Sequence, residues 1–294
     1  MRQATRDLLA AAGLPAAYVR DLAARTLAED LGGPNGVDVT AVATIPAAQR
    51  GTGELIARAD GVLAGLAVAA AVFDLASDGE LEFTPLAEDG ARIRRDDVLA
   101  TITGPLRALL TAERNALNLL CRVSGVATHT RRWADELDGT GTTVLDTRKT
   151  TPGLRLLEKY AVRCGGGTNK RMGLYDVAMI KDNHKIAAGS ITAAFDAVRS
   201  AFPEIPVQVE VTTLSEAVEA VGAGATFLLC DNMTPKELWE VVAAVGSEAE
   251  LEATGGLTLD RAREFAETGV DYLSVGGLTH SSPILDIALD LRAG

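Results

Sequence analysis

The chain is poor in aromatic residues, histidine and cysteine, and each shortage excludes a class of site. Phe, Trp and Tyr together make up 4% of its 294 residues, which argues against a surface that stacks nucleic-acid bases. The three histidines do not have the spacing of zinc ligands. The three cysteines, Cys121, Cys164 and Cys230, are odd in number and form no CxxC pair. Such cysteines are typical of reduced cytosolic thiols rather than of a disulfide framework.

Long hydrophobic runs and excess positive charge are also missing. No segment approaches the roughly 20 apolar residues of a membrane-spanning helix, and the first residues, MRQATRDLLAAAGLPAAYVRDL, have regular arginines and no long apolar core. The sequence therefore predicts neither a signal peptide nor a membrane protein, and we expect a cytoplasmic one. The formal net charge is −12, with 28 Lys and Arg against 40 Asp and Glu. A nucleic-acid surface needs broad positive charge, so we expect none.

One part of this acidic chain is basic. Residues 146–185, which we call the basic segment, contain nine Lys or Arg and four Asp or Glu, a local balance of +5. A cleft lined by charges of one sign raises the local concentration of the opposite sign. The basic segment therefore predicts a binding site for an anionic ligand.

The pattern of strands and helices changes along the chain. Residues 1–110 mix the two without regular alternation, which favours a compact α+β domain. A long amphipathic helix is predicted from about Thr111 to Leu137. Beyond Gly141, buried strands alternate with amphipathic helices, which is typical of an α/β fold with a parallel sheet and, in this number, of a barrel. We count six clear strands, TTVLD, VAMIKD, VQVEVT, TFLLCDN, ELEATGG and DYLSVGG, and a further one is possible at 164–168.

Polar residues follow the ends of these strands, where βα barrels place their reactive groups. Glu210 and Asp231 end successive strands, so they could hold a hydrated Mg²⁺ or face a developing cation. The alternative is that each carboxylate only stabilises the N-terminus of the next helix. Five cations come from three loops and suit phosphate groups or a polycarboxylate; they are Arg148, Lys149, Lys170, Arg171 and Lys181.

Other signals have simpler interpretations. The glycine-rich ends ATGG and VGGL are typical of tight turns when taken singly, and as a pair they favour phosphate binding. Arg155, Lys159 and Arg163 fit the exposed face of a helix, and Arg114 could be a helix surface charge. The chain is predicted to end in an amphipathic helix from Pro283 to Leu291.

The motifs together resemble one family from near the N-terminus to near the C-terminus. They are EDL…DVT, TAERNALNLLCRVSGVAT, DTRKTTPGLRLLEKYAVRCGGG, GLYDVAMIKDNH, VEV, LLCDNM, EATGGL and VDYLSVGGLTHS. This series resembles nicotinate-nucleotide pyrophosphorylase, also called quinolinate phosphoribosyltransferase. The resemblance implies transfer of phosphoribosyl from phosphoribosyl pyrophosphate to quinolinate, with loss of CO₂, to give nicotinate mononucleotide for NAD synthesis.

The same resemblance implies a fold and an assembly. The fold would be an N-terminal α/β sandwich domain over residues 1–115 followed by an incomplete, about seven-stranded, TIM-like α/β barrel over 116–280. The C-terminal helix, 281–294, would pack back on the first domain. The active site would be shared between the subunits of a homodimer or larger oligomer, with Mg²⁺ as the cofactor.

The resemblance also implies roles for individual residues. The catalytic and metal positions would be Lys149, Glu210 and Asp231, with the metal held by the two carboxylates. The substrate-binding positions would be Arg114 from the neighbouring subunit, Arg148, Lys170, Arg171, Lys181, Thr254, Gly255, Gly276 and His280. Lys170 departs from the family pattern, because this chain has Asn169-Lys170-Arg171 where N-H-R is common.

Three other functions remain open on the sequence. Lys170 raises the possibility of a related phosphoribosyltransferase that acts on a different aromatic carboxylate. A barrel that binds phospholigands without catalysis is disfavoured by the presence of Lys149, Glu210 and Asp231 together. A phosphosugar aldolase or isomerase with Lys181 as a Schiff-base lysine rests on analogy of fold alone.

Overall fold

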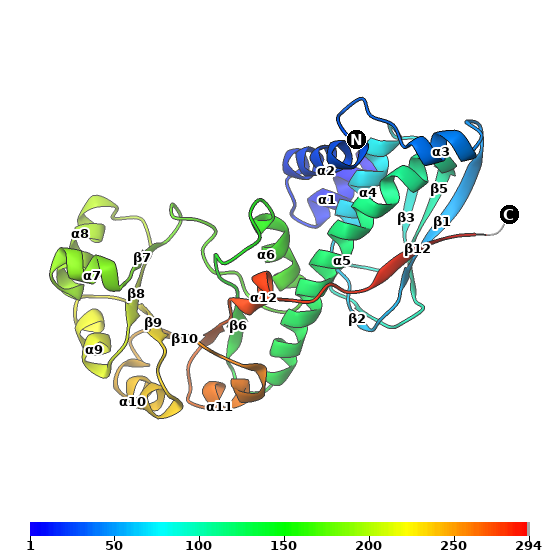
Figure 1. The fold of residues 1–294 in the computed structure, drawn as a ribbon. Helices are drawn as coiled ribbons and strands as arrows, with labels where there is room; N and C mark the ends of the chain where they lie inside the picture. The colour runs from blue at the N-terminus through cyan, green and yellow to red at the C-terminus, as the bar shows by residue number, and fades with distance from the viewer. Residues whose placement is uncertain (293–294) are drawn as a thin grey trace. The chain divides into compact units, whose positions relative to one another are not determined.

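The computed structural model describes residues 1–292, and the chain packs as two units. The first unit contains residues 1–129, the segment 156–165 and the C-terminal segment from Ser282 (Figure 1). The second contains residues 130–155 and 166–281. The expected boundary after residue 115 differs from this division, which falls after His129 inside a helix. No helix of the described residues is long and apolar enough to cross a membrane.

An antiparallel sheet and a helical layer form the first unit. The sheet has the order β12-β1-β5-β3, and its strands are β1 (Arg50–Ala57), β3 (Glu82–Pro85), β5 (Val98–Pro105) and β12 (Ile287–Leu291). The short strands β2 (Gly61–Val62) and β4 (Arg92–Ile93) pair separately. The helices are α1 (Gln3–Ala11), α2 (Ala16–Leu31), α3 (Val39–Thr44) and α4 (Leu66–Ala76). Helix α4 is apolar on all sides and is buried from Leu66 to Asp74, as expected of a helix at the centre of a core.

The C-terminal segment is a strand, so the predicted helix from Pro283 to Leu291 is wrong. β12 pairs antiparallel with β1, and Leu289 lies opposite Leu55. Two ion pairs reinforce this pairing, between Arg58, just after β1, and Asp290 of β12 at 2.6 Å, and between Arg292, just after β12, and Glu54 of β1. The apolar spacing allowed a helix, but β1 has a free edge whose backbone groups need partners, and the segment supplies them.

Helix α5 (Leu106–Glu136) is longer at its N-terminus than predicted. It begins directly after β5, five residues before Thr111, and runs for 31 residues. The backbone N–H of Leu106 donates to the carbonyl oxygen of Gln49, which fixes the start of the helix beside β1. Arg114 therefore lies in the third turn of α5, well inside the helix.

Gly125 of α5 lies against the chain that leads into β12, and alanine should not fit there. A Cβ at this position would lie 2.1 Å from the carbonyl oxygen of Pro283, which is a backbone atom and cannot turn away. Gly125→Ala is expected to lower the free energy of unfolding by about 1–3 kcal/mol, the usual cost of overpacking. Urea unfolding measures the change. Gly222→Ala is the control, because nothing lies within 4 Å of its Cβ position; an equal loss in both variants would contradict the proposed contact.

The second unit is built on a parallel sheet in the order β6-β11-β10-β9-β8-β7. Its strands are β6 (Thr143–Leu145), β7 (Ala178–Ile180), β8 (Val207–Val211), β9 (Phe227–Asp231), β10 (Glu250–Thr254) and β11 (Tyr272–Ser274). The last strand pairs with the first, as in a barrel. The expected seventh strand is reduced to one parallel bridge between Leu145 and Thr168. Within the described residues β7 pairs only with β8, so the barrel stays open beside β7 and the predicted incomplete barrel is confirmed.

Helices follow the strands in sequence and leave the carboxyl ends of the strands accessible. They are α7 (Asp182–Ala188), α8 (Ile191–Ala201), α9 (Leu214–Gly222), α10 (Pro235–Val245), the 3₁₀ turn η1 (Leu259–Arg261), α11 (Ala262–Ala266) and α12 (Gly277–His280). The boundaries are set by local caps, because the Ser190 hydroxyl accepts the N–H of Ala193 and Thr234 forms a capping box with Glu237. Helix α6 (Arg155–Cys164) follows the DTRKTTPG loop and belongs, from Leu156, to the first unit.

Candidate active site

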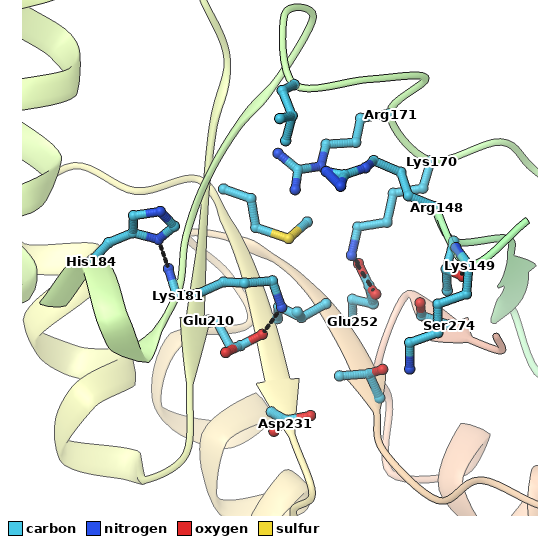
Figure 2. A pocket seen from close by; sticks show the side chains of 15 residues that line it. Arg148, Lys149, Lys170, Arg171, Lys181, His184, Glu210, Asp231, Glu252 and Ser274 are labelled. Carbon is cyan, nitrogen blue, oxygen red and sulfur yellow. Dashed lines mark hydrogen bonds and ion pairs between the residues drawn. The ribbon is translucent and has the colours of Figure 1, made fainter. Parts of the chain in front are cut away.

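A cavity of about 440 Å³ opens at the carboxyl ends of the barrel strands, and every residue that lines it belongs to the second unit. Side chains from the ends of all six strands or from the loops after them reach it (Figure 2). Its lining residues are Thr147, Arg148, Lys149, Lys170, Arg171, Leu174, Met179, Lys181, His184, Glu210, Leu229, Asp231, Glu252, Thr254 and Ser274. Eight of the twelve residues singled out from the sequence are therefore brought together in one place.

Arg148 and Arg171 bring two like charges to the upper part of this cavity (Figure 2). Burial and the positive charge of Arg148 both lower the pKa of Arg171. Arg171 donates from Nη1 to the carbonyl oxygen of Val177 at 3.0 Å, whereas the buried Nε of Arg148 has no hydrogen-bond partner among the described residues. Two neighbouring guanidinium groups with donors to spare are suited to an anion, which would satisfy both.

Arg155 orders the loops that carry these arginines, so its assignment to an exposed helix face is wrong. Its guanidinium donates to Thr150 Oγ1 at 3.0 Å, to the carbonyl oxygen of Met172 at 3.0 Å and to that of Arg148 at 3.3 Å. Lys159 was assigned to the same face and is fully buried. The helical spacing located a polar stripe correctly, but charge alone does not show whether a polar stripe faces water or buried partners.

Lys170 and Glu252, which both line the cavity, form a buried ion pair. The two oxygens of Glu252 lie 2.5 and 2.6 Å from Lys170 Nζ, and the side chains are 0% and 7% exposed, respectively. Burial lowers the pKa of Lys170 and raises the pKa of Glu252, and the pairing opposes both shifts. The ammonium of Lys170 is thus already neutralised inside the protein. The sequence showed Glu252 at a strand end but gave no sign that Lys170 was its partner.

Asp146 holds the loop that carries Lys170 in place. This fully buried carboxylate accepts the Asn169 amide Nδ2 at 2.6 Å and the Lys170 backbone N–H at 2.9 Å. Asp146→Ala is expected to lower the free energy of unfolding by about 3 kcal/mol, because buried donors without partners cost about 1–3 kcal/mol each. Chemical unfolding measures this loss. The exposed Asp138→Ala should leave stability unchanged, and an equally small effect of both changes would show that Asp146 does not fix the loop.

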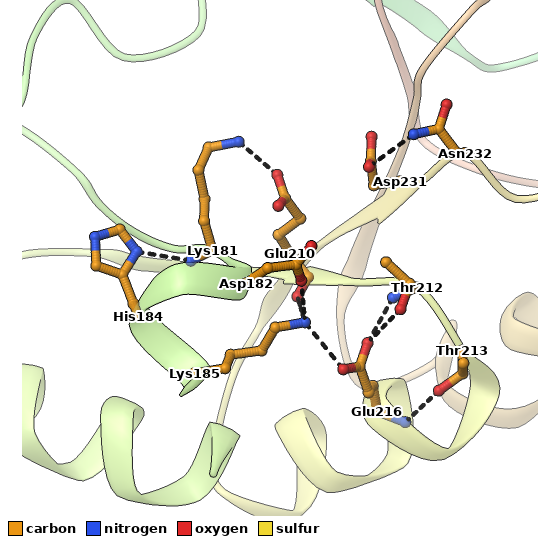
Figure 3. Close-up of polar contacts among 10 residues, drawn as sticks. All are labelled: Lys181, Asp182, His184, Lys185, Glu210, Thr212, Thr213, Glu216, Asp231 and Asn232. Atoms are coloured by element: carbon orange, nitrogen blue, oxygen red, sulfur yellow. Dashed lines mark hydrogen bonds and ion pairs between the residues drawn. The ribbon is translucent and has the colours of Figure 1, made fainter. Parts of the chain in front are cut away.

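Lys181 and Glu210 form a second ion pair, which is more exposed. Lys181 Nζ lies 2.5 Å from Glu210 Oε2, and the lysine side chain is 46% exposed. The backbone N–H of Lys181 donates to His184 Nδ1 at 3.0 Å, so the neutral imidazole carries its proton on Nε2 (Figure 3). His184 follows the end of β7, a position from which it could donate to a phosphate, and it lines the cavity.

Asp231 ends β9 beside Glu210, and the two carboxylates influence each other. Burial, followed by the negative charge of Glu210, raises the pKa of Asp231, and a 2.8 Å hydrogen bond from Asn232 opposes the shift. Asn232 is held in the left-handed region at φ 55°. A Cβ at residue 255 would lie 2.2 Å from Asn232 Oδ1, so Gly255 leaves the space that this asparagine needs.

The pKa shift of Asp231 gives a pH-dependent stability with a definite sign. A carboxyl group whose pKa is raised by folding binds its proton more tightly in the folded state than in the unfolded state. Its contribution to stability therefore falls as pH rises from the usual Asp range through the raised pKa. Relative to Asp231→Asn, the wild type should lose stability as pH rises over this range, which urea unfolding at a series of pH values measures. Glu210→Gln should reduce this loss, because the neighbouring charge is gone; a pH dependence of stability unchanged in both variants would refute the assignment.

Four of the expected site residues do not line the cavity. Gly276 lies beside it, where a Cβ would meet Lys149 Cδ at 3.0 Å and His280 Nε2 at 3.3 Å. His280 is exposed, and its Nδ1 lies 2.6 Å from Ser281 Oγ. Gly255 acts through Asn232, as described above. Arg114 belongs to the first unit and lines a separate hollow there with Glu29, Asp30 and Asn115 among others.

The carboxylates of the cavity suit one kind of metal better than others. Among residues 1–292 no group of three or more His, Cys, Asp or Glu side chains is placed to hold a metal ion. Mg²⁺ commonly takes one or two carboxylates and completes its shell with phosphate oxygens and water. Glu210 and Asp231 fit that requirement, and their mutual repulsion is one that a cation would relieve. A zinc or calcium site built from the protein alone does not fit these residues.

The sequence and the fold match a known family over most of their length. Residues 38–124 match the quinolinate phosphoribosyl transferase N-terminal domain, and residues 126–290 match its C-terminal domain. The nicotinate-nucleotide pyrophosphorylase (carboxylating) of Mycobacterium leprae is 47% identical, over 92% of this chain and 96% of that protein. A quinolinate phosphoribosyltransferase (decarboxylating) of Nicotiana glauca is 37% identical, over 90% of this chain and 80% of the other.

A solved structure agrees with these matches. The nicotinate-nucleotide pyrophosphorylase of Francisella tularensis superposes with a TM-score of 0.90 at 34% identity, over 95% of this chain and 98% of the other. The likeness thus extends over both units of the chain. On the two family models and these relatives together, the chain belongs to the quinolinate phosphoribosyl transferase family.

Proposed function

We propose that this chain transfers the phosphoribosyl group of phosphoribosyl pyrophosphate to quinolinate, with release of pyrophosphate and CO₂ and formation of nicotinate mononucleotide. Membership of the family supports the reaction. The observation that carries the proposal is the single cavity in which five cations face three carboxylates at the barrel edge. Both substrates are polyanions, and the bond that breaks lies at a carbon that becomes cationic. The cavity contains groups suited to each.

The neighbouring guanidinium groups suit the two carboxylates of quinolinate, which is pyridine-2,3-dicarboxylate. Burial and the nearby charge of Arg148 lower the pKa of Arg171, so the two guanidinium groups lie close together, and an arginine can bind a carboxylate through two parallel hydrogen bonds. Lys181 would hold the second carboxylate from the opposite wall. Apolar side chains of Leu174 and Met179 also line the cavity and would contact the pyridine ring.

The reaction needs positioning and charge stabilisation more than acid–base chemistry. The pyridine nitrogen forms a bond to C1 of the ribose while the bond from C1 to the pyrophosphate oxygen breaks, and C1 carries positive charge as it does so. Glu210 and Asp231 would stabilise that charge or bind the ribose hydroxyls. The bond from C2 to its carboxyl carbon then breaks and CO₂ leaves. The electron pair stays on C2, stabilised by the positive charge of the adjacent pyridinium nitrogen, until C2 takes a proton from water.

The remaining polar groups suit the phosphates. Lys149 would contact the phosphoribosyl side, and Thr254 at the end of β10 would donate from its hydroxyl to the 5′-phosphate. Gly276, directly before α12, and His280, at the end of α12, would act on the same phosphates, and Gly276 leaves room for the side chain of Lys149. Glu210 and Asp231 would hold the Mg²⁺, which when bound neutralises part of the charge on pyrophosphate.

A second subunit would complete the site. Arg114 lies in the first unit, in a hollow separate from the cavity. We infer that this arginine reaches the cavity of a neighbouring copy, which would require a homodimer or larger oligomer with shared sites. We expect a cytoplasmic location for this reaction. Within residues 1–292 no helix is long and apolar enough to cross a membrane.

Lys170 bears on which aromatic acid is the substrate. Its ion pair with Glu252 supports a related activity on another aromatic carboxylate, because a neutralised ammonium binds an added carboxylate less strongly. The experiment is turnover with phosphoribosyl pyrophosphate, Mg²⁺ and a panel of pyridine and benzene carboxylic acids in competition. Preference for quinolinate is expected. Faster turnover of a different acid would show that this acid, and not quinolinate, is the substrate. Lys170→His should shift the preference if this position selects the acid.

A further inference from the structure

Lys185 is a buried lysine that lies outside the cavity, one helical turn after Lys181. Its side chain is 9% exposed. Its ammonium lies 2.7 Å from Asp182 Oδ1, 2.9 Å from Glu216 Oε1 and 3.2 Å from the backbone carbonyl oxygen of Glu210 (Figure 3). The proposed reaction assigns it no part, although it is one of the nine cations of the basic segment.

The three partners of Lys185 come from three elements that meet beside the Lys181–Glu210 ion pair. Asp182 begins α7 and directly follows Lys181, and Glu210 lies in β8. Glu216 lies in the first turn of α9, and its other oxygen accepts the backbone N–H of Thr212 at 2.7 Å and its hydroxyl at 2.9 Å. One ammonium therefore connects the start of α7, the end of β8 and the loop that leads into α9.

We propose that Lys185 is a positioning residue for the Lys181–Glu210 pair. Its bond to the Glu210 carbonyl fixes the backbone from which the Glu210 carboxylate projects. Its ion pair with Asp182 fixes the residue next to Lys181 in the chain. The catalytic consequence rests on the proposed function, in which Glu210 faces the charge that develops at C1; the structural consequence does not.

The charge of Lys185 matters as well as its contacts. Without its ammonium, Asp182 and Glu216 would share a partly buried space with no cation between them, and one or both would move away. Lys185→Met keeps the length and apolar character of the side chain and removes only the ammonium. Lys185→Arg keeps the charge and the donors.

The test compares steady-state kinetics with hydrogen exchange in the same variants. Lys185→Met should lower kcat by about 10- to 100-fold, the usual effect of losing a group that orients a site residue. KM for quinolinate should change less than kcat, because two of the three cations proposed to hold its carboxylates, Arg148 and Arg171, are untouched. The backbone amides of residues 178–184 and 207–213 should exchange faster. Lys185→Arg should restore most of kcat, and Lys236→Met, a change at an exposed lysine of α10, should alter nothing.

Two results would overturn the proposal. One is a Lys185→Met protein with wild-type kcat, even if it is less stable. The other is unchanged exchange in both segments, which would show that the ammonium does not hold them. If the wild type fails to turn over quinolinate, the proposed function fails, but the exchange measurement still decides whether Lys185 holds the two segments.

Discussion

Asp231→Asn is expected to lower kcat for the quinolinate reaction by about 100- to 1000-fold, the size of effect found when a group that stabilises transition-state charge is removed. The side chain keeps its shape and loses only its charge. KM for quinolinate should stay close to the wild-type value, because the positive charge at C1 exists in the transition state and not in the bound substrate. Initial rates over a range of quinolinate concentrations separate the two constants.

A matched control for this variant is available in the same unit. Asp260→Asn removes one negative charge at the exposed turn η1 and should leave kcat unchanged. The fold of Asp231→Asn should be intact, since burial and Glu210 already favour the uncharged form of this carboxyl group. A loss of less than about tenfold in kcat would mean that Asp231 does not face the reacting carbon.

Arg148→Met is expected to raise KM for quinolinate by about 100-fold, because loss of a charge-assisted contact costs about 1.5–3 kcal/mol. The ligand-free protein should lose little stability, since the change removes a positive charge that, together with burial as the larger cause, lowers the pKa of Arg171. Weaker binding without destabilisation would identify a residue retained for binding at the expense of stability. Initial rates over a range of quinolinate concentrations and thermal unfolding measure the two effects.

Arg261→Met provides the comparison for that experiment. This arginine pairs with Glu264 on the surface of the second unit, and its side chain is 51% exposed. Its loss should change neither KM for quinolinate nor the thermal stability. Arg148→Lys separates charge from shape: if the two parallel hydrogen bonds of a guanidinium matter, lysine recovers only part of the affinity. Full recovery with lysine would show that Arg148 acts as a point charge alone.

The barrel and its reactive edge could be predicted from the sequence because both depend on local pattern. Buried strands separated by amphipathic helices indicate a parallel sheet, and polar residues directly after such strands lie at one edge of it. For this reason Lys149, Glu210 and Asp231 could be predicted as site residues from the sequence, and all three line one cavity. The helix predicted at the end of the chain was wrong, because IALDL has a spacing that suits either a short helix or a strand. Only the free edge of β1 decides between the two.

Pairings between distant residues could not be predicted. Lys170 and Glu252 are 82 residues apart, and nothing in either segment shows that they meet. Arg155 and Lys159 read as surface charges, since helical periodicity does not reveal what covers a polar face. The partners of Lys185 could not be predicted for the same reason, because they lie on three different elements. The sequence thus located the site, whereas its internal charge pairs required the structure.

The central claim is tested most directly with quinolinate labelled with ¹³C in the 2-carboxyl group, supplied with phosphoribosyl pyrophosphate and Mg²⁺. The account predicts that labelled CO₂, pyrophosphate and unlabelled nicotinate mononucleotide form in equal amounts, and that omission of phosphoribosyl pyrophosphate abolishes release of the label. Retention of the label in a nucleotide product, or no consumption of quinolinate by folded protein, would contradict it.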